Sequence, residues 1–361
     1  MTTLILSSKK ERNFNMKIKW GVIGCGGIAD RRTLPGMMLA GNAELVAVMD
    51  ANKEAADRCK EKYNAKYAFD NVEELLALEE IEAVYIASPV FCHKEQTYRA
   101  ADAGKHILIE KPVGLTSAEA EEIAAYCDAK GVKIGVGFMM RFHAYHQKMR
   151  EIVQSGKIGE VVSARAQLTC WYPEMENCWR QDMKLSGGGA MMDMGVHCVD
   201  LIRYITGLEV TEVAGFAGNQ VFKYSVEDAG CVIFRLNNGA TAYVDANFNI
   251  PDAAAKCKIE FYGTKGSIFA QGTIAQVEGG EIEVLCTDNG AEYDANQDRG
   301  EVKPLEMNVE FGNMYTKEIE AFGKAVKGEG EIPITAADAI MSQKVIEASY
   351  ESNKSKKYVT L

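Results

Sequence analysis

The chain has 361 residues, a formal net charge of -11, and a composition of 47% hydrophobic and 25% charged residues. This acidic balance argues against nucleic acid or an anionic membrane surface as a partner, because either would require a basic face. The length exceeds one ordinary core and suits two domains, and no apolar run reaches the roughly 18 residues that a membrane span needs.

The first 15 residues carry no targeting signal. Their apolar run, Leu4-Ile5-Leu6, is too short for a signal-peptide core, and charged residues follow it. Met16 stands directly before the first strand-like run, so we predict that residues 1–15 are a disordered or artefactual leader. The ten cysteines are scattered and include no Cys-x-x-Cys pair, which indicates reduced thiols, a cytoplasmic location and no metal site.

The first predicted elements are a strand over residues 18–23 and a helix over about 28–40. Between them, Gly24-Cys25-Gly26-Gly27-Ile28-Ala29 has the pattern Gly-x-Gly-x-x-Ala. Gly24 permits the tight turn, Gly26 leaves room for a pyrophosphate, and Ala29 lets the helix lie close to the strand. The helix N-terminus then faces the phosphates.

A second apolar run, residues 44–49, ends in Asp50, where a dinucleotide fingerprint expects an acid. A carboxylate there accepts hydrogen bonds from the adenosine ribose and repels a 2′-phosphate. We therefore predict an NAD site, with NADP less favoured. Arg31 and Arg32 are an alternative signal, since either could meet a 2′-phosphate.

Strands and helices continue to alternate as far as residue 137. The run Ala83-Val84-Tyr85-Ile86-Ala87 is apolar throughout, which is typical of a strand buried on both faces of a parallel sheet. We predict a doubly wound Rossmann domain over residues 16–139. Further strands are expected at 66–68, 83–87, 106–109 and 133–137, and helices at 53–63, 72–78, 93–103 and 117–130.

Beyond Met140 the pattern changes to longer strand-like runs joined by hairpin signals such as Asn237-Asn238-Gly239. We predict an α+β domain over residues 140–361, with a large, open, mostly antiparallel sheet and helices on one face. Residues 271–310 are assigned to hairpins and loop. Helices are expected at 144–154, 313–327 and 336–352, and strands at 161–169, 210–218, 230–236, 240–247, 256–262, 267–270 and 358–361.

Three residues have the chemistry of a dehydrogenase site. Lys111 ends a predicted buried strand at the cofactor edge, where an ammonium group can hold a reacting oxygen. Asp193 and His197 follow a glycine-rich loop at a spacing that places them on one helix face. A histidine held by an aspartate can accept an alcohol proton. The alternatives are a solvated lysine, and an acid at a helix N-terminus beside a core histidine.

These motifs together resemble the Gfo/Idh/MocA oxidoreductases, which include glucose-fructose oxidoreductase and inositol dehydrogenases. The resemblance runs from Lys17 to the C-terminus. It is carried by Gly21 to Ala29, Ala87-Ser88-Pro89 with His93, Ala103 to His106 leading into Glu110-Lys111-Pro112, Gly187 to Asp193 with His197 and Asp200, and Glu347 to Ser352.

The resemblance implies that Lys111, Asp193 and His197 are the catalytic set. It also implies a second domain that binds substrate and forms homodimers or homotetramers. The predicted cofactor-binding residues are Gly24, Gly26, Gly27, Ile28, Asp50, Ser88, Pro89, His93, Glu110 and Lys111. The predicted substrate-binding residues are Lys111, Arg141, Trp179, Arg180, Asp193 and His197, because aromatic faces and arginines suit sugars.

We therefore expect an NAD-dependent dehydrogenase that oxidises a secondary hydroxyl of a sugar, glycoside or cyclitol. One alternative is a glycosidase that oxidises its sugar transiently and recycles NAD. A second is a cofactor-binding sensor without catalysis, which the retained lysine and histidine make less favoured.

Overall fold

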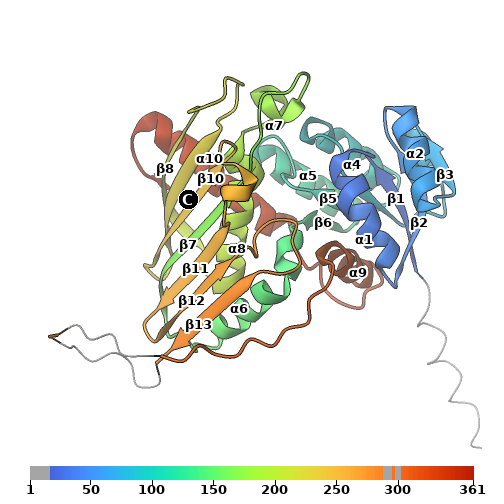
Figure 1. Cartoon of the computed structure of the whole chain (residues 1–361). Coiled ribbons are helices and arrows are strands. Elements are labelled where there is room, and N and C mark those ends of the chain that lie inside the picture. The colour runs from blue at the N-terminus through green and yellow to red at the C-terminus, as the bar shows by residue number, and fades with distance from the viewer. Residues whose placement is uncertain (1–16, 288–294, 297–301) are drawn as a thin grey trace, which may run out of the picture.

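The computed structural model describes residues 17–287, 295–296 and 302–361. They are built around two β-sheets, one on each side of Figure 1. The predicted leader, residues 1–15, lies outside the described residues. So do residues 288–294 and 297–301, which form part of the stretch assigned to hairpins and loop.

The N-terminal sheet is the predicted doubly wound sheet. Its six strands are all parallel, in the order β3-β2-β1-β4-β5-β6. The order reverses between β1 and β4, and ligands of such sheets bind beyond the carboxyl ends of the strands at this point. The strands are β1 Ile18–Ile23, β2 Ala43–Met49, β3 Tyr67–Phe69, β4 Ala83–Ile86, β5 His106–Glu110 and β6 Ile134–Gly137.

Helices cover this sheet, and side-chain caps explain where some of them begin. The Asn52 side chain accepts from the backbone N–H groups of Glu54 and Ala55, and Thr116 accepts from that of Glu119. A π-helical turn, Ala29–Thr33, follows the glycine motif and leads directly into α1. The helices are α1 Leu34–Leu39, α2 Lys53–Tyr63, α3 Val72–Leu76, α4 His93–Asp102 and α5 Ser117–Lys130.

The second sheet has eight strands in the order β13-β12-β11-β7-β10-β9-β8-β14. All neighbours are antiparallel except β7 and β10, so the prediction of an open, mostly antiparallel sheet is confirmed. The strands are β7 Val161–Thr169, β8 Val210–Gly218, β9 Ala229–Leu236, β10 Thr241–Asn247, β11 Lys258–Gly263, β12 Gly266–Gln271, β13 Glu281–Cys286 and β14 Val359–Thr360.

Helices pack on the inner face of this sheet, which is turned toward the Rossmann sheet (Figure 1). They are α6 Ala144–Gln154, α8 Val196–Thr206 and α10 Ala336–Ser355, and a short helix, α7 Met183–Ser186, precedes α8. The other face is open. It exposes Phe216, Ile233 and Tyr243 on the adjacent strands β8, β9 and β10, and Ile233 lies directly opposite Tyr243.

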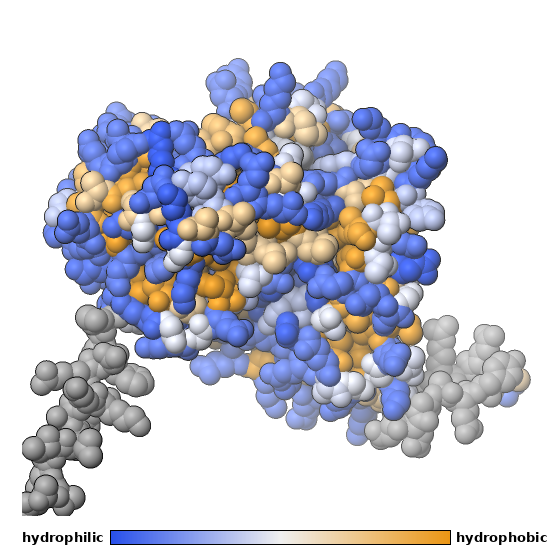
Figure 2. All heavy atoms as spheres, turned by 180° about the vertical axis from the view of Figure 1, so that it is seen from behind, coloured by the Kyte–Doolittle hydropathy of each residue, from blue (hydrophilic) through white to orange (hydrophobic). Residues whose placement is uncertain are grey.

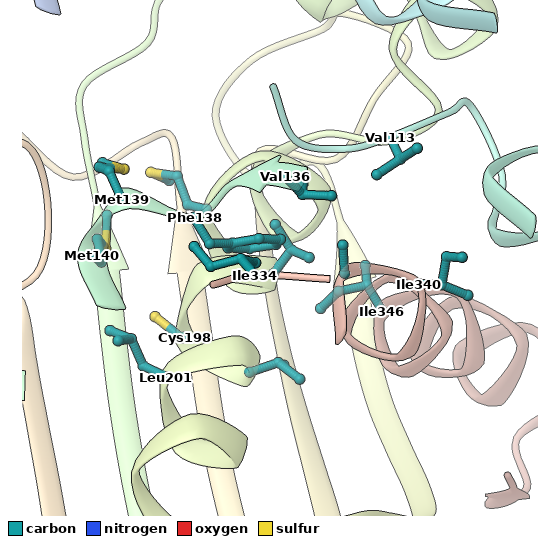
Figure 3. Packing of buried hydrophobic residues seen from close by; sticks show 14 of the residues in the cluster. Val113, Val136, Phe138, Met139, Met140, Cys198, Leu201, Ile334, Ile340 and Ile346 are labelled. Atoms are coloured by element: carbon teal, nitrogen blue, oxygen red, sulfur yellow. The ribbon is translucent and has the colours of Figure 1, made fainter. Parts of the chain in front are cut away.

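One continuous core joins the two halves. Phe138, Met139 and Met140, which follow β6, belong to the same buried cluster as residues of α8 and α10, including Cys198 and Ile346 (Figure 3). The two halves are therefore packed together rather than tethered by a linker.

Helix α9, Met314–Val326, returns to the N-terminal sheet. Its Ile319 and Phe322 belong to the buried cluster around Trp20 of β1, and the rings of Phe322 and Trp20 have centroids 5.7 Å apart. In Figure 1, α9 lies beside α1. This part of the 140–361 segment therefore packs with the N-terminal sheet rather than with the sheet of its own half.

The outer surface is mixed in character. Seen from the side opposite to Figure 1, it is mostly hydrophilic with apolar patches between the polar side chains (Figure 2). Among the helices in the described ranges, none combines the length and the apolar character that crossing a membrane requires.

Candidate active site

The glycine turn packs directly against the end of β4. Gly24 has a φ of +97°, and a Cβ at this position would lie 2.7 Å from the Ser88 nitrogen. Only glycine fits such a close approach in this conformation. A Cβ at Gly26 would meet no atom within 4 Å, so its backbone borders open space. This is the arrangement predicted for a turn that receives a pyrophosphate.

Asp50 lies in register with that turn. Its carboxylate accepts hydrogen bonds from the backbone N–H of Cys25 at 2.8 Å and of Asn52 at 2.9 Å. The acid is therefore fixed beside the glycine turn, as the fingerprint predicts. Arg32, the alternative signal for a 2′-phosphate, instead donates from Nε to Gln276 Oε1 at 2.7 Å and connects the first helix to the second half.

His93 supports the two loops at the sheet edge. Its side chain is buried, with Nε2 3.0 Å from the Ser88 carbonyl oxygen and Nδ1 3.0 Å from that of Pro112. Burial lowers the pKa of His93 to about 4, although its contacts with backbone carbonyls oppose this shift. Because both ring nitrogens face backbone carbonyls, the ring holds the two loops together. Its predicted contact with the cofactor stays a prediction.

Glu110 also faces inward. Its carboxylate accepts from the Tyr85 hydroxyl, whose oxygen in turn accepts from Thr33 Oγ1 at 3.0 Å. Burial raises the pKa of Glu110, which Tyr85 and Lys111 partly offset. These contacts place Glu110 in a polar chain, and its predicted contact with the cofactor stays a prediction. That chain links the start of the first helix to the loop that carries Lys111.

Lys111 and Asp193 meet across the two halves. Lys111 Nζ donates to Asp193 Oδ1 at 2.8 Å and to the Asp193 backbone oxygen at 2.6 Å. The lysine side chain is 12% exposed and that of the aspartate 35%. Enclosure by itself would raise the pKa of Asp193, but the positive charges of Lys111 and Arg180 outweigh it and lower that pKa. Asp193 is therefore a carboxylate.

Asp193 lies in a π-helical turn, Met191–Gly195, that leads into α8. The wider turn changes the spacing of side chains, and such turns often occur at functional sites. Gly195 ends this turn, and a Cβ there would lie 3.3 Å from the Met191 side chain and 3.5 Å from that of Ile346. Core packing therefore explains this glycine.

Buried Glu227 anchors the loop before Asp193. Its carboxylate accepts from the backbone N–H groups of Gly189 at 2.9 Å and Met191 at 3.0 Å, and from the Tyr350 hydroxyl at 2.7 Å. A Cβ at Gly189 would lie 2.0 Å from the Glu227 backbone oxygen. Sequence reasoning missed Glu227, because no local motif connects it to a loop almost 40 positions earlier.

His197 is the third member of the predicted set. It is 5% exposed, its ring meets Phe138 edge-on at 5.3 Å, and its Nδ1 has no hydrogen-bond partner among the described residues. Burial and the charge of Lys111 lower the pKa of His197 well below its usual range, while Asp193 opposes this shift. Within the described residues Asp193 bonds to Lys111 and acts on the neutral imidazole through its charge.

The predicted substrate residues separate into two groups. Buried Arg141 donates to both oxygens of Asp200, at 2.6 and 2.8 Å, and to Asp338 at 3.4 Å. These bonds engage its guanidinium in the core, so the structure does not support its predicted contact with substrate. The Arg180 guanidinium lies 4.4 Å from the centre of the Trp179 ring, and its charge acts on Asp193. Arg180 is thus close enough to Asp193 for its charge to act on that carboxylate, and its contact with substrate stays a prediction.

Comparison with known proteins identifies both halves. A model described as "Oxidoreductase family, NAD-binding Rossmann fold" matches residues 18–138, and one described as "GFO/IDH/MocA C-terminal domain" matches residues 146–269. The chain belongs to the Gfo/Idh/MocA family. The predicted family, fold and oxidoreductase class are thereby confirmed.

Relatives in the Gfo/Idh/MocA family match along most of the chain. It is 32% identical over 282 residues to oxidoreductase P35 of Formosa agariphila, covering 76% of this chain and 86% of that protein. It is 28% identical to 1,5-anhydro-D-fructose reductase of Ensifer adhaerens, covering 90% and 92%. The solved aldose-aldose oxidoreductase of Caulobacter crescentus has the same fold, with a TM-score of 0.85 at 23% identity over 96% of this chain and 100% of that one.

Proposed function

We propose that this Gfo/Idh/MocA protein is an NAD-dependent dehydrogenase that oxidises a secondary hydroxyl of a sugar, glycoside or cyclitol to a ketone. The observation that carries the proposal is the bond between Lys111 of the Rossmann half and Asp193 of the second half, beside the neutral ring of His197. This contact supports a site that combines a cation able to hold the substrate oxygen with a base able to accept a proton.

The residues of the glycine turn fit a dinucleotide. Gly26 borders open space at the start of a helix, and Asp50 stands in register beside it. We infer that these residues hold NAD rather than NADP, since the Asp50 carboxylate would repel a 2′-phosphate and Arg32 is engaged with Gln276. When bound, the nicotinamide group supplies hydride-accepting chemistry.

The chain's own groups then handle the oxygen and the proton. The Lys111 ammonium holds the substrate oxygen and stabilises the negative charge that develops on it. His197, kept neutral by its surroundings, accepts the hydroxyl proton. The Asp193 carboxylate stabilises the positive charge that His197 then carries. Arg180 donates to a neighbouring hydroxyl of the substrate.

The open sheet face supports a proposal on assembly. Phe216, Ile233 and Tyr243 are 69%, 49% and 38% exposed on three adjacent strands. Such a row is suited to burial against a second copy. We propose a homodimer or homotetramer formed through this face. Sedimentation of the wild type and of Ile233→Asp tests it, and a monomeric wild type would contradict it.

The decisive experiment is a screen of polyols, sugars and glycosides with NAD and NADP, following the absorbance of reduced cofactor. We expect turnover with NAD and a loss of about 100-fold or more in kcat for His197→Ala. His106→Ala, a half-buried histidine at the opposite end of β5, is the control. Normal turnover by His197→Ala would refute its role, and aglycone release without net NADH would favour transient oxidation.

A further inference from the structure

A groove of about 540 Å³ lies beside the active site and contains none of its catalytic residues. This volume is within the range of small-molecule sites. One wall is the loop before α7, and the other is the segment before β9. The groove is lined chiefly by Glu174, Met175, Cys178, Trp179, Asp182 and Tyr224.

The groove and the active site share a wall. Cys178 and Trp179 line the groove, while the next residue, Arg180, acts by its charge on Asp193. Tyr172 reinforces this wall, since its hydroxyl lies 3.1 Å from Cys178 Sγ. Helix α7, which carries the lining residue Leu185, also contacts the turn Val90–Cys92 at the cofactor edge of the Rossmann sheet. The groove is therefore close to the edge at which Lys111 and Asp193 meet.

Hydrogen bonds keep the loop in place. Buried Gln181 donates from its amide to the Pro173 carbonyl at 2.6 Å and accepts from the Met175 N–H at 2.9 Å. Across the groove, the Tyr224 hydroxyl donates to the Tyr172 carbonyl at 3.3 Å. These contacts hold the walls without a ligand, which lowers the ordering cost of binding one.

The lining has the chemistry of a carbohydrate subsite. Trp179 and Tyr224 line the groove, and each ring has one neighbour against it, the Arg180 guanidinium at 4.4 Å and the Phe222 ring at 5.5 Å. Sugar C–H groups would pack on the opposite faces of the two rings. Glu174 Oε1 accepts from the backbone N–H of Lys223 at 2.7 Å, and Asp182 Oδ1 accepts from that of Lys184 at 2.9 Å. The second oxygen of each carboxylate and the Lys223 ammonium are then the polar groups with which hydroxyl groups of a ligand can bond.

We propose that this groove binds a second sugar ring, linked through a glycosidic bond to the ring that is oxidised at Lys111 and His197. The substrate class is then a disaccharide or an aryl or glycosyl glycoside rather than a free monosaccharide. This inference rests on the proposed function, because it assigns the neighbouring ring to the active site.

The test compares methyl β-D-glucoside with cellobiose, and methyl α-D-glucoside with maltose. Each pair shares the oxidised ring and the linkage and differs in the second ring. We expect kcat/KM with NAD to be about tenfold or more higher for the disaccharide. We expect the ratio of kcat/KM for the disaccharide to that for the methyl glucoside to fall toward one in two variants. Tyr224→Ala removes a ring that lines the groove, and Met175→Trp fills the groove without removing a contact. Tyr358→Ala, an exposed tyrosine outside the groove, is the matched control.

A second readout separates this proposal from the proposed function. Saturation-transfer NMR of cellobiose and maltose with the NADH-bound enzyme reports the second ring directly. A signal on that ring that Met175→Trp abolishes supports the groove even where no sugar reduces NAD, an outcome that would overturn only the dehydrogenase. Absence of that signal, or a kcat/KM ratio unchanged in both groove variants, overturns the groove as a sugar subsite.

Discussion

The two sheets solve the problem of burial in different ways. In the N-terminal sheet, helices cover both faces, so β4 is buried at each of its four positions. In the second sheet only one face is covered, and β10 alternates between exposed or half-buried and buried residues. The first pattern makes the strand ends the place where a ligand is expected. The second leaves a face of the sheet exposed, on which the proposed assembly rests.

The largest expected effect is on the free energy of unfolding, when neighbouring residues of one strand are replaced by alanine. In β5, Ile107 and Leu108 are both buried, so Ile107→Ala and Leu108→Ala should each cost about 2–5 kcal/mol of unfolding free energy. In β9, Phe234→Ala should cost about 3–5 kcal/mol, but Ile233→Ala, on the open face, less than about 0.5 kcal/mol in the monomer. Denaturant unfolding measures all four, and a costly Ile233→Ala in a monomer would contradict the open face.

The second effect concerns the contact between the halves. Lys111→Met should lower kcat by about 100- to 1000-fold, because the developing charge on the substrate oxygen loses its donor. NADH binding, followed by fluorescence, should persist. Lys94→Met, an exposed lysine near the same sheet edge that pairs with Glu122, should turn over normally. Loss of NADH binding in Lys111→Met would indicate a cofactor role instead.

A third effect concerns the support of Asp193 from within the second half. Glu227→Ala leaves the N–H groups of Gly189 and Met191 and the Tyr350 hydroxyl without their acceptor. We expect a loss of about 2–4 kcal/mol in unfolding free energy. The control is Glu351→Ala, at the exposed position that follows Tyr350, which should change the free energy of unfolding by less than about 0.5 kcal/mol. An unchanged stability of Glu227→Ala would show that water replaces the carboxylate.

The smallest expected effect concerns Glu318, a buried residue of the helix α9 that packs against the N-terminal sheet. This carboxyl is buried, and neither oxygen has a partner among the described residues. Burial, reinforced by Glu110, raises the pKa of Glu318 well above its ordinary value of 4.5. Above pH 4.5 the Glu318 carboxyl loses its proton in the unfolded chain but keeps it in the folded chain. The free energy of unfolding therefore falls as pH rises toward the pKa of the folded state.

Glu318→Gln replaces the carboxyl with an amide that does not titrate, so this pH-dependent loss of stability disappears. The variant should therefore gain stability relative to the wild type as pH rises from 5 to 8, whereas Glu329→Gln, at an exposed position just after α9, should not. Thermal unfolding at several pH values measures both. A difference between Glu318→Gln and the wild type that does not change with pH would mean that the carboxyl is not held protonated.

Local patterns were sufficient for most of the elements. The strand over residues 18–23, the helix over 53–63 and the strand over 161–169 begin and end where predicted. Each is determined by its own burial pattern or cap, which nearby residues carry. The π-helical turns at Ala29–Thr33 and Met191–Gly195 were not predicted, because an extra residue in a helical turn leaves the hydrophobic pattern almost unchanged.

The sequence by itself determined the Rossmann half and the glycine turn with Asp50, and it predicts Lys111, Asp193 and His197 as the reactive groups. These depend on contacts within one strand, turn or helix, or on residue chemistry alone. Only the tertiary structure decided the pairings: Asp193 with Lys111 rather than with His197, Arg141 with Asp200, Glu227 under the glycine loop, and α9 on the first sheet. Such pairings join residues tens to hundreds of positions apart, and their energies depend on distances that no local pattern encodes.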